Sequence, residues 1–361
     1  MNTKNRKSNV KVSRRSLLRS GLSLGAAALA APALIRPAGA QSGGEVVYAT
    51  WGGSWEEAMK KAWFEPFTQA TGIKVLTVQD NTYGKYQSMV ESGSVEWDVV
   101  ESNPDFQYFG MAKELFEPLD FSVINREPIM PGEGVVTEYS VPQVLWSRVL
   151  AYNTDKVSTE PESLADLFNP ALPATPRLIY AKPNSGAFEA ALVGAGVAPD
   201  ALYPMDLDRV FAKWDEVKDQ LSFYDTNAQA QQSITDGSVG LCIMPDGRAM
   251  SAIDGGAPVR IQYQHSIMTW SCMTVPKGAP NRDNAMKLLA YLMTPEAQAA
   301  IAEAYTYGPV VPSAFDLISP ERAAILSGGP HQQGKFIMVN EKWWAENLDE
   351  ANERLVEWRL M

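Results

Sequence analysis

The sequence is poor in the residues from which most enzyme and metal sites are built. Its 361 residues include two histidines and two cysteines, and neither histidine has a Cys, His or Glu neighbour at a metal-ligand spacing. Beyond residue 40 the chain lacks the G-x-S-x-G, H-E-x-x-H, Walker and G-x-G-x-x-G motifs. These absences argue against zinc enzymes, serine hydrolases and nucleotide-dependent enzymes. A hydrolase that uses a pair of carboxylates stays open, because acidic residues are plentiful.

The two cysteines do not form a metal-binding or redox motif. Cys242 and Cys272 are far apart in the sequence, and each lies inside an apolar run that is typical of a strand. An oxidising compartment allows a disulfide between them, whereas buried free thiols are common in such runs. We favour two buried thiols.

Long hydrophobic runs are also missing, and the one near the amino terminus is too short to span a membrane. The segment 20–35 is uncharged and rich in Ala, Leu and Gly, but it falls short of the ~20 apolar residues of a spanning helix. Arg14 and Arg15 precede it, and Ala38-Gly39-Ala40 follows it. A basic region, an apolar region and an A-x-A site make an export signal, and the paired arginines indicate the twin-arginine route. We expect residues 1–40 to be removed near Gln41.

Basic residues are scarce once this signal is set aside. Eight of the 31 Lys and Arg residues and none of the 42 acidic residues lie in residues 1–40, so 23 bases remain against 42 acids, a formal charge of −19. Such a surface repels nucleic acid and anionic lipid. The remaining 321 residues exceed one typical core and predict two domains.

Strands and helices alternate along the chain. Short β-branched runs at 45–50, 73–78 and 97–100 are predicted strands, and helices are expected at 54–70 and 83–91. The same alternation returns later, with strands at 178–180 and 238–244 and helices at 106–114, 187–193, 207–219, 284–292 and 295–304. This order predicts an α/β fold with a mostly parallel sheet.

Aromatic and small polar residues gather where the predicted strands end. Examples are the segments 51–55 (WGGSW), 102–105 (SNPD), 245–248 (PDGR), 270–271 (WS) and 305–308 (YTYG). Ligands of α/β sheets bind outside the carboxyl ends of strands, and aromatic walls with a few polar anchors are typical of small-molecule sites. Packing in the core is the alternative for each single tryptophan, but the repeated placement favours binding.

Several segments in this order resemble one known family. Residues 46–55 (VVYATWGGSW) and 64–75 (FxPFxxxTGIxV) look like the opening of type II periplasmic binding proteins, closest to the spermidine/putrescine-binding branch of ABC importers. Four later segments agree in order, and the resemblance covers essentially all of the chain after the signal: 97–100 (WDVV), 150–153 (LAYN), 275–278 (VPKG) with 285–292 (AxxLLAYL), and 294–297 (TPEA).

The resemblance implies an α/β fold of two lobes, each a mostly parallel sheet flanked by helices, with a ligand cleft between them. It also implies a monomer that delivers its ligand to an inner-membrane ABC permease. The expected boundaries are residues 41–140 plus 274–306 for the first lobe, 147–267 plus 313–361 for the second, and 141–146, 268–273 and 307–312 for the hinge segments.

Four positions match ligand-binding residues of that family. Trp51 matches its stacking tryptophan, Ser102 and Asn103 match the ligand-contacting end of a strand, and Glu189 matches an acid that binds an amine. The match fails at Gly186 and at Ser271, where polyamine binders place aspartates.

Two missing carboxylates would leave ammonium groups of a polyamine without partners. Asp80 and Asp246 are the acids that could compensate. The helix start at Ser185-Gly186 also offers free N–H groups, which suit a carboxylate or phosphonate. A zwitterion therefore competes with a polyamine as the ligand.

These observations predict a periplasmic solute-binding protein that captures a small amine-containing solute, a polyamine or a related compound. The alternatives are a binder of a zwitterionic amino acid, a 4-aminobutyrate-like compound or an aminophosphonate, and, less favoured, a metal carrier or a secreted hydrolase. We expect no catalytic residue, cofactor or metal, and no nucleic-acid partner. The twin-arginine translocase is the expected partner during export. The predicted ligand-binding residues are Trp51, Gly52, Asp80, Ser102, Asn103, Gly186, Glu189, Asp246, Trp270, Ser271 and Tyr307.

Overall fold

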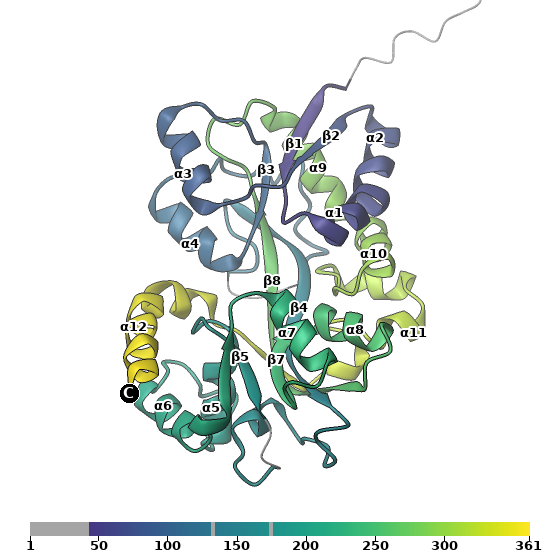
Figure 1. Cartoon of the computed structure of the whole chain (residues 1–361). Coiled ribbons are helices and arrows are strands. Elements are labelled where there is room, and N and C mark those ends of the chain that lie inside the picture. The colour runs from purple at the N-terminus through teal and green to yellow at the C-terminus, as the bar shows by residue number, and fades with distance from the viewer. Residues whose placement is uncertain (1–42, 131–133, 173–175) are drawn as a thin grey trace, which may run out of the picture. The chain divides into compact units, whose positions relative to one another are not determined.

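A mixed β-sheet organises the chain, which a computed structural model describes over residues 43–130, 134–172 and 176–361 (Figure 1). The predicted export signal at 1–40 lies outside these residues. The strand order is β2-β1-β3-β8-β4-β7-β5-β6, with β9 beside β8. The strands are β1 (Glu45–Ala49), β2 (Lys74–Val78), β3 (Val99–Ser102), β4 (Ser140–Asn153), β5 (Arg177–Tyr180), β6 (Leu221–Tyr224), β7 (Leu241–Pro245), β8 (Val259–Thr274) and β9 (Phe336–Met338).

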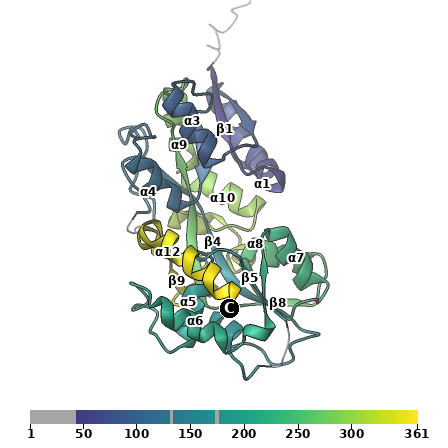
Figure 2. The same cartoon turned by 60° about the vertical axis from the view of Figure 1, so that its left-hand side comes forward.

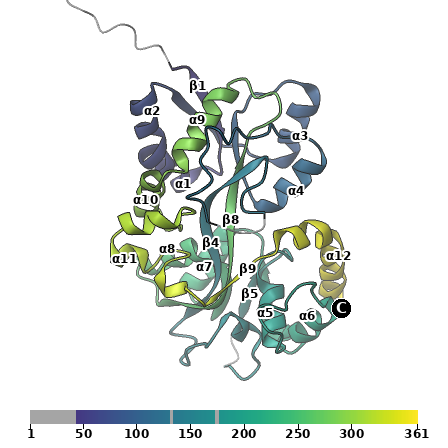
Figure 3. The same ribbon diagram turned by 180° about the vertical axis from the view of Figure 1, so that it is seen from behind.

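The sheet consists of two parallel sets that share a central antiparallel pair. In the first half β1 lies between β2 and β3 and is parallel to both. In the second half β5 lies between β6 and β7, again parallel to both. The 14-residue β4 and the 16-residue β8 pair antiparallel and join the halves, as the centre of Figure 3 shows. The predicted α/β fold with mostly parallel strands is confirmed within each half.

The helices of the first half come from both ends of the sequence. They are α1 (Gly53–Met59), η1 (Lys60–Phe64), α2 (Glu65–Thr71), α3 (Tyr83–Ser92), α4 (Pro104–Ala112), α9 (Arg282–Leu292) and α10 (Pro295–Ala304). The helix expected at 54–70 is thus continuous but contains a π-helical segment, η1. Pro66 lies in the first turn of α2, and because proline has no N–H it cannot make the regular bond of an uninterrupted α-helix.

The second half is covered by helices whose apolar faces point to the sheet. They are η2 (Leu164–Phe168), α5 (Ala187–Gly194), α6 (Leu207–Asp215), η3 (Lys218–Gln220), α7 (Asn227–Thr235), α8 (Asp246–Asp254) and α12 (Glu341–Leu360). Helix α6 buries Leu207, Val210, Phe211 and Trp214, which is the spacing of one helix face. The short η4 (Pro312–Leu317), α11 (Pro320–Ala323) and η5 (Pro330–Gln332) lie between α10 and β9 in the sequence.

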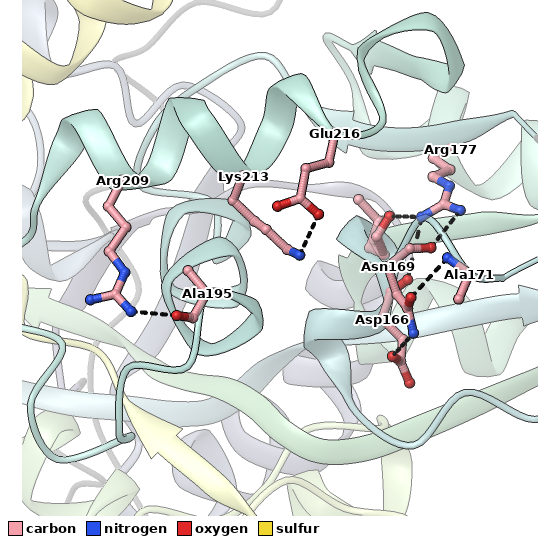
Figure 4. Close-up of polar contacts among 9 residues, drawn as sticks. Asp166, Asn169, Ala171, Arg177, Ala195, Arg209, Lys213 and Glu216 are labelled. Atoms are coloured by element: carbon pink, nitrogen blue, oxygen red, sulfur yellow. Dashed lines mark hydrogen bonds and ion pairs between the residues drawn. The ribbon is translucent and has the colours of Figure 1, made fainter.

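One buried arginine of the second half serves the backbone. The Arg177 guanidinium donates to the carbonyl oxygens of Leu167 and Asn169, the latter at 2.9 Å, and its Nε donates to Gln220 at 3.2 Å. Figure 4 shows the contact of Arg177 with Asn169 beside the ion pair of Lys213 on α6 with Glu216, the residue after that helix. The contacts satisfy carbonyl groups at the end of η2, which have no partner within that short helix. Arg177 therefore has a structural role.

The carboxyl-terminal helix reaches from the second half to the first. The α12 residues Trp344, Ala351, Leu355 and Trp358 join the core of the second half, while the helix also packs against α4 of the first half, as Figure 2 shows. No helix of the described residues is long and apolar enough to cross a membrane.

Candidate functional site

The carboxyl ends of the two parallel sets face each other across the central pair. Strand β3 is antiparallel to β8, and its last residue, Ser102, lies opposite Cys272. Strand β7 is antiparallel to β4, and its last residue, Pro245, lies opposite Arg148, which pairs on its other side with Ile267 of β8. The two strand ends are therefore separated by five residues of β8, or roughly 17 Å. Ligands of α/β sheets bind at such ends, so this part of β8 marks the candidate site.

Arg148 of β4 is a buried cation at this place. The residue is 8% exposed, and its Nη1 donates to the Tyr224 hydroxyl at 3.2 Å. Its guanidinium carbon lies 5.2 Å from the ring centroid of Trp146 and 5.3 Å from that of Tyr180. Within the described residues, no Asp or Glu forms an ion pair with Arg148. The aromatic rings stabilise and orient the cation, and its remaining N–H donors suit a carboxylate.

The contrast with Arg177 shows what is unusual about Arg148. Both guanidinium groups are buried, but Arg177 uses its donors on backbone carbonyl oxygens. Arg148 has one hydroxyl as its hydrogen-bond partner in the described part of the chain. A buried charge without an ionic partner is costly, and an anionic ligand would reduce this cost. Arg148 is therefore the strongest candidate for a ligand-binding cation.

The amino terminus of α5 lies beside Arg148. Gly186 precedes the helix with a φ of +82°, a conformation that favours glycine. The Ser185 hydroxyl is buried and has no hydrogen-bond partner among the described residues. A helix amino terminus presents free N–H groups and a positive dipole end. Together with Arg148 these groups have the chemistry that suits a carboxylate.

Two acids, Glu189 and Glu341, lie near this cation without forming an ion pair with it, and a third, Asp105, lies near Glu341. Glu189 is fully buried, and its Oε1 accepts from the Tyr203 hydroxyl at 2.6 Å and from Trp344 Nε1 at 2.9 Å. Burial raises the pKa of Glu189, whereas these two bonds and the charge of Arg148 lower it. Glu341 at the start of α12 and Asp105 at the start of α4 are the other two, and burial raises the pKa of both carboxyl groups. The site thus holds charges of both signs.

Trp51 lies at the carboxyl end of β1 and is 50% exposed. Its backbone N–H donates to the buried carboxylate of Glu101, which also accepts from Thr50 Oγ1 at 2.6 Å, Trp55 Nε1 at 2.9 Å and Gln143 Nε2 at 2.7 Å. Gly52 follows with a φ of +75°. An exposed indole on a fixed backbone suits a stacking contact, so its position is compatible with the predicted role.

The predicted residues at the end of β3 are divided between core and surface. The Ser102 hydroxyl is buried and lies 3.2 Å from Cys272 Sγ. Asn103 is exposed and precedes α4 at the N-cap position, where its side chain makes no capping hydrogen bond. Asp80 is partly exposed and forms an ion pair with Lys85 at 3.0 Å. Because Lys85 already balances its charge, Asp80 does not supply a free carboxylate for an amine.

Asp246 lies on the other face of the sheet. Its carboxylate accepts from the Ser327 hydroxyl and from the Gly247 N–H at 2.8 Å, and Ser327 contacts the hydroxyl of Ser147 at 2.9 Å. Successive residues of a strand point to opposite faces, so Ser147 and its partner Asp246 lie opposite to Arg148. The expectation that Asp246 compensates for a missing acid beside Gly186 does not agree with this position.

Tyr307 belongs to the same side as Asp246. Its ring packs against Trp55 at 5.4 Å and Tyr305 at 4.9 Å. A β-carbon on Gly247 would lie 3.3 Å from the Tyr307 ring. Tyr307 therefore packs between residues of both halves.

Trp270 is part of the core and does not line the candidate site. It is 1% exposed and belongs to the hydrophobic cluster of the first half. The prediction that its indole flanks a ligand does not agree with this burial. Ser271 follows it on β8 and is also buried. The aromatic wall comes instead from Trp146, which pairs with Thr269 and lies against Arg148.

The structure also locates the two cysteines, and it can be searched for metal sites and surface hollows. Cys242 and Cys272 are buried free thiols, as favoured above. Among the described residues, no group of three or more His, Cys, Asp or Glu is placed to hold a metal ion. Two surface hollows of about 260 and 270 Å³ lie at the end of α4 and beside α12. Neither contains a predicted ligand-binding residue, and both are open to solvent, so they are not the candidate site.

The fold and this site define a class: binding proteins with two α/β halves and a ligand site at the facing strand ends. The chain belongs to the family of bacterial extracellular solute-binding proteins, whose model matches residues 62–328. It is an extracellular, periplasmic-type component of an ABC transporter.

Individual relatives agree with this assignment. The chain is similar to a gamma-aminobutyric acid-binding protein of Pseudomonas aeruginosa, with 30% identity over 86% of this chain and 89% of that protein. A spermidine/putrescine-binding periplasmic protein of Salmonella typhimurium is 24% identical over 83% of this chain and 87% of that protein. A solved structure of a GABA receptor matches with a TM-score of 0.79 and 37% identity, covering 87% of this chain and 97% of that one.

Sequence reasoning missed several residues that the structure brings to the site. Arg148 had a visible signal, since it is the one charged residue in the run 144–152. Glu341 had none, because acids are common at helix starts and this one reaches the site from the far end of the sequence. Asp105 lies in the segment 102–105, which the sequence analysis singled out, but Ser102 and Asn103 were predicted there as the ligand-binding residues.

Proposed function

We propose that the chain captures a small solute that carries both a carboxylate and an amine, such as 4-aminobutyrate, and delivers it to an ABC permease. One observation carries this proposal: Arg148 is a buried cation without an acidic partner among the described residues. The α5 amino terminus and the unpartnered Ser185 hydroxyl support a carboxylate at the same place. The relative and the solved structure named for 4-aminobutyrate are consistent with it.

The same residues disfavour a plain polyamine. Arg148 repels an ammonium group, and Gly186 and Ser271 supply no charge where polyamine binders have aspartates. One ammonium group of spermidine can meet the acids of the site, but a second one at Arg148 would lie beside a buried cation, which costs free energy. Trp51 and Trp146 can still cover the methylene groups of a zwitterion, as their ring exposure allows.

Calorimetric titration with four probes tests this function. We expect 4-aminobutyrate to bind wild type more tightly than putrescine, spermidine or 2-aminoethylphosphonate. Arg148→Met removes the cation but keeps an apolar side chain, and it should weaken 4-aminobutyrate binding by about 3 kcal/mol, roughly a hundredfold. Arg126→Met is the control, because Arg126 also lies over a ring, that of Phe121 at 4.1 Å, but on the surface. Tight spermidine binding without a response to 4-aminobutyrate would overturn the proposal.

The proposed function also includes export to the periplasm and binding without a covalent reaction. We infer that residues 1–40 direct the chain through the twin-arginine translocase to the periplasm, where it acts as a monomer. In this proposal the site binds the solute and releases it unchanged, without a covalent step.

We also propose that the two halves are mobile lobes. The expected hinge segments 141–146 and 268–273 fall inside β4 and β8, the pair that joins the halves, and 307–312 is the third. Contacts of one ligand with both halves favour the closed state over the open one. Small-angle scattering tests this: the radius of gyration should fall when the ligand saturates the protein, and an unchanged value would count against the hinge.

A further inference from the structure

Glu341 occupies the middle of the region between the two strand ends. Strand β9 pairs with β8 from Ser266 to Met268, and the Val339 N–H donates to the Met268 carbonyl at 3.0 Å. These contacts bring the start of α12 beside β8, where Glu341 accepts a hydrogen bond from the Thr269 hydroxyl. Glu341 is 8% exposed. Its carboxylate is therefore buried next to the part of β8 that marks the candidate site.

Asp105 reaches the same region from the first half. It lies in the first turn of α4, and its Oδ1 accepts from the Tyr83 hydroxyl at 3.2 Å and the Phe106 N–H at 2.9 Å. Helices α4 and α12 are in contact, as Figures 1 and 2 show. The charge of Asp105 also raises the pKa of Glu341, so the two carboxylates repel each other.

Neither acid forms an ion pair within the described ranges. Each feels one cation at a longer range, because the charge of Lys182 lowers the pKa of Asp105 and the charge of Arg148 lowers that of Glu341. A second and independent sign of a missing ligand is the Oε2 of Glu189, which is fully buried and lacks a hydrogen-bond partner among the described residues. Glu189 and Glu341 thus lie near Arg148, and Asp105 lies near Glu341 and Lys182. Three acids stand against two cations, and an ammonium group would supply the third positive charge.

We propose that Asp105 and Glu341 close on the ammonium group of the ligand from the two halves of the sheet. The proposal rests on the proposed function, which places the carboxylate of the ligand at Arg148. Arg148 pairs with Ile267, and Glu341 contacts Thr269 two residues further along the same face of β8. The two subsites are therefore offset by roughly 7 Å along the strand, a span that suits opposite charges at the two ends of a short chain.

Ligand binding then releases a proton. Burial, together with the charges of Asp105 and Glu189, raises the pKa of Glu341 to about 8. Free Glu341 consequently holds a proton below pH 8, whereas an adjacent ammonium favours the carboxylate. Because the proton must leave, affinity rises with pH up to about 8 and then becomes constant. The titratable and charged groups that act on Glu341 or respond to its charge are Arg148, Glu189, Asp105, Cys272 and Tyr203.

We call Asp105 and Glu341 around the ammonium group the clamp. Calorimetry on the whole mature protein tests it. Wild type is titrated with 4-aminobutyrate at pH 6, 7 and 8, in buffers that differ in their enthalpy of ionisation. We expect about one proton released at pH 7 and an affinity that is roughly tenfold tighter at pH 7 than at pH 6. Glu341→Gln should bind at least about tenfold more weakly at pH 8 and lose the dependence on pH and buffer. Asp105→Asn should also weaken binding.

Two controls separate the clamp from other effects. Asp98→Asn changes a buried acid that bonds the Val47 and Asn281 N–H groups, away from the strand ends, and should leave the affinity unchanged. Butyrate carries no amine, so its binding should not weaken in Glu341→Gln. Circular dichroism checks the fold of each variant, and if Glu341→Gln does not fold, the proton release of wild type decides.

Failure of the clamp differs from failure of the proposed function. If both acid variants bind 4-aminobutyrate within twofold of wild type and no proton is released, the clamp is overturned while the carboxylate site at Arg148 stands. If wild type binds putrescine and not 4-aminobutyrate, the proposed function is overturned. The same variants and buffers then test the clamp with putrescine, and a loss of affinity in Glu341→Gln supports it.

Discussion

Gly186 lies directly against Arg148. A β-carbon on Gly186 would stand 3.2 Å from the β-carbon of Arg148, and the backbone there has a φ of +82°. The position therefore admits a side chain only with strain, and any side chain would begin in contact with Arg148 and Ile267. In the proposed function, glycine at 186 leaves room for the carboxylate that Arg148 would bind.

This pair predicts how the ligand preference could be changed. Gly186→Asp places a carboxylate beside Arg148, where it competes with the carboxylate of the ligand. We expect 4-aminobutyrate binding to weaken by about 2 kcal/mol or more, because the new ion pair uses the same donors. Titration calorimetry measures the loss.

Gly186→Ala is the matched control for that change. It introduces the same backbone strain, about 1 kcal/mol of stability, without the charge. Both variants carry this strain, but the aspartate variant also gains an ion pair with Arg148, so it should be no less stable in urea than the alanine variant while it loses more affinity. Equal affinities of the two variants would contradict an anion subsite at this position.

Some of this site was visible in the sequence, and the reason differs from residue to residue. Glu45–Ala49 and Lys74–Val78 are strands because β-branched runs end at glycine or at polar turns, so the edge that carries Trp51 could be predicted. Which residues of β4 and β8 are buried could not be predicted, because this depends on which strands become neighbours in the sheet. Trp270 and Trp146 both lie in apolar runs, yet one enters the core and the other faces Arg148.

The face of the sheet is the second property that the sequence did not reveal. Asp246 ends a strand, as predicted, but the contact from Ser147 through Ser327 places it on the side opposite to Arg148. A shift of one residue in strand register would reverse this outcome. The position of Glu341 was harder still to predict, because it depends on the pairing of β9 with β8.

Glu101 is predicted to hold Trp51 in place. Its carboxylate accepts four hydrogen bonds, one of them from the Trp51 N–H. Glu101→Gln puts an amide donor among these donors, so at least one is left without an acceptor, at a cost of about 1–3 kcal/mol. We expect lower stability in urea and weaker ligand binding.

A second buried acid of the same half serves as the comparison. Asp98→Asn also disturbs bonds to N–H groups, those of Val47 and Asn281, and should lower stability without changing affinity. If Glu101→Gln keeps the affinity of wild type, the fixed backbone of Trp51 has no part in binding.

The paired arginines of the predicted signal give a prediction about export. Replacing Arg14 and Arg15 together by lysine keeps the charge of the amino-terminal region but removes the twin-arginine feature. We expect the precursor to stay in the cytoplasm, as cell fractionation and immunoblotting would show. Lys4 and Lys7 changed together to arginine form the control and should not affect export. Normal secretion of the lysine variant would refute the twin-arginine route.

The last prediction concerns stability and pH. Burial raises the pKa of Asp246 from its usual value near 3.8 to about 6, even though the bonds from Ser327 and Gly247 lower it. The folded protein therefore holds this proton more tightly than the unfolded chain does. The resulting stabilisation is fully present below about pH 4 and is lost as the pH rises to about 6.

Asp246→Asn removes this titration while it keeps a polar group at the same place. Its Oδ1 can accept from Gly247, and Ser327 can accept from its amide while donating to Ser147. Relative to the variant, the free energy of unfolding of wild type should fall by about 1.4 kcal/mol per pH unit between pH 4 and 6 and then stay constant. Urea unfolding from pH 4 to 8 measures this difference. Asp236→Asn is the control with the opposite sign, because bonds from Ser238 lower the pKa of that exposed carboxyl group. A wild-type minus Asp246→Asn difference that is independent of pH would show that Asp246 is not buried as described, since only burial raises its pKa.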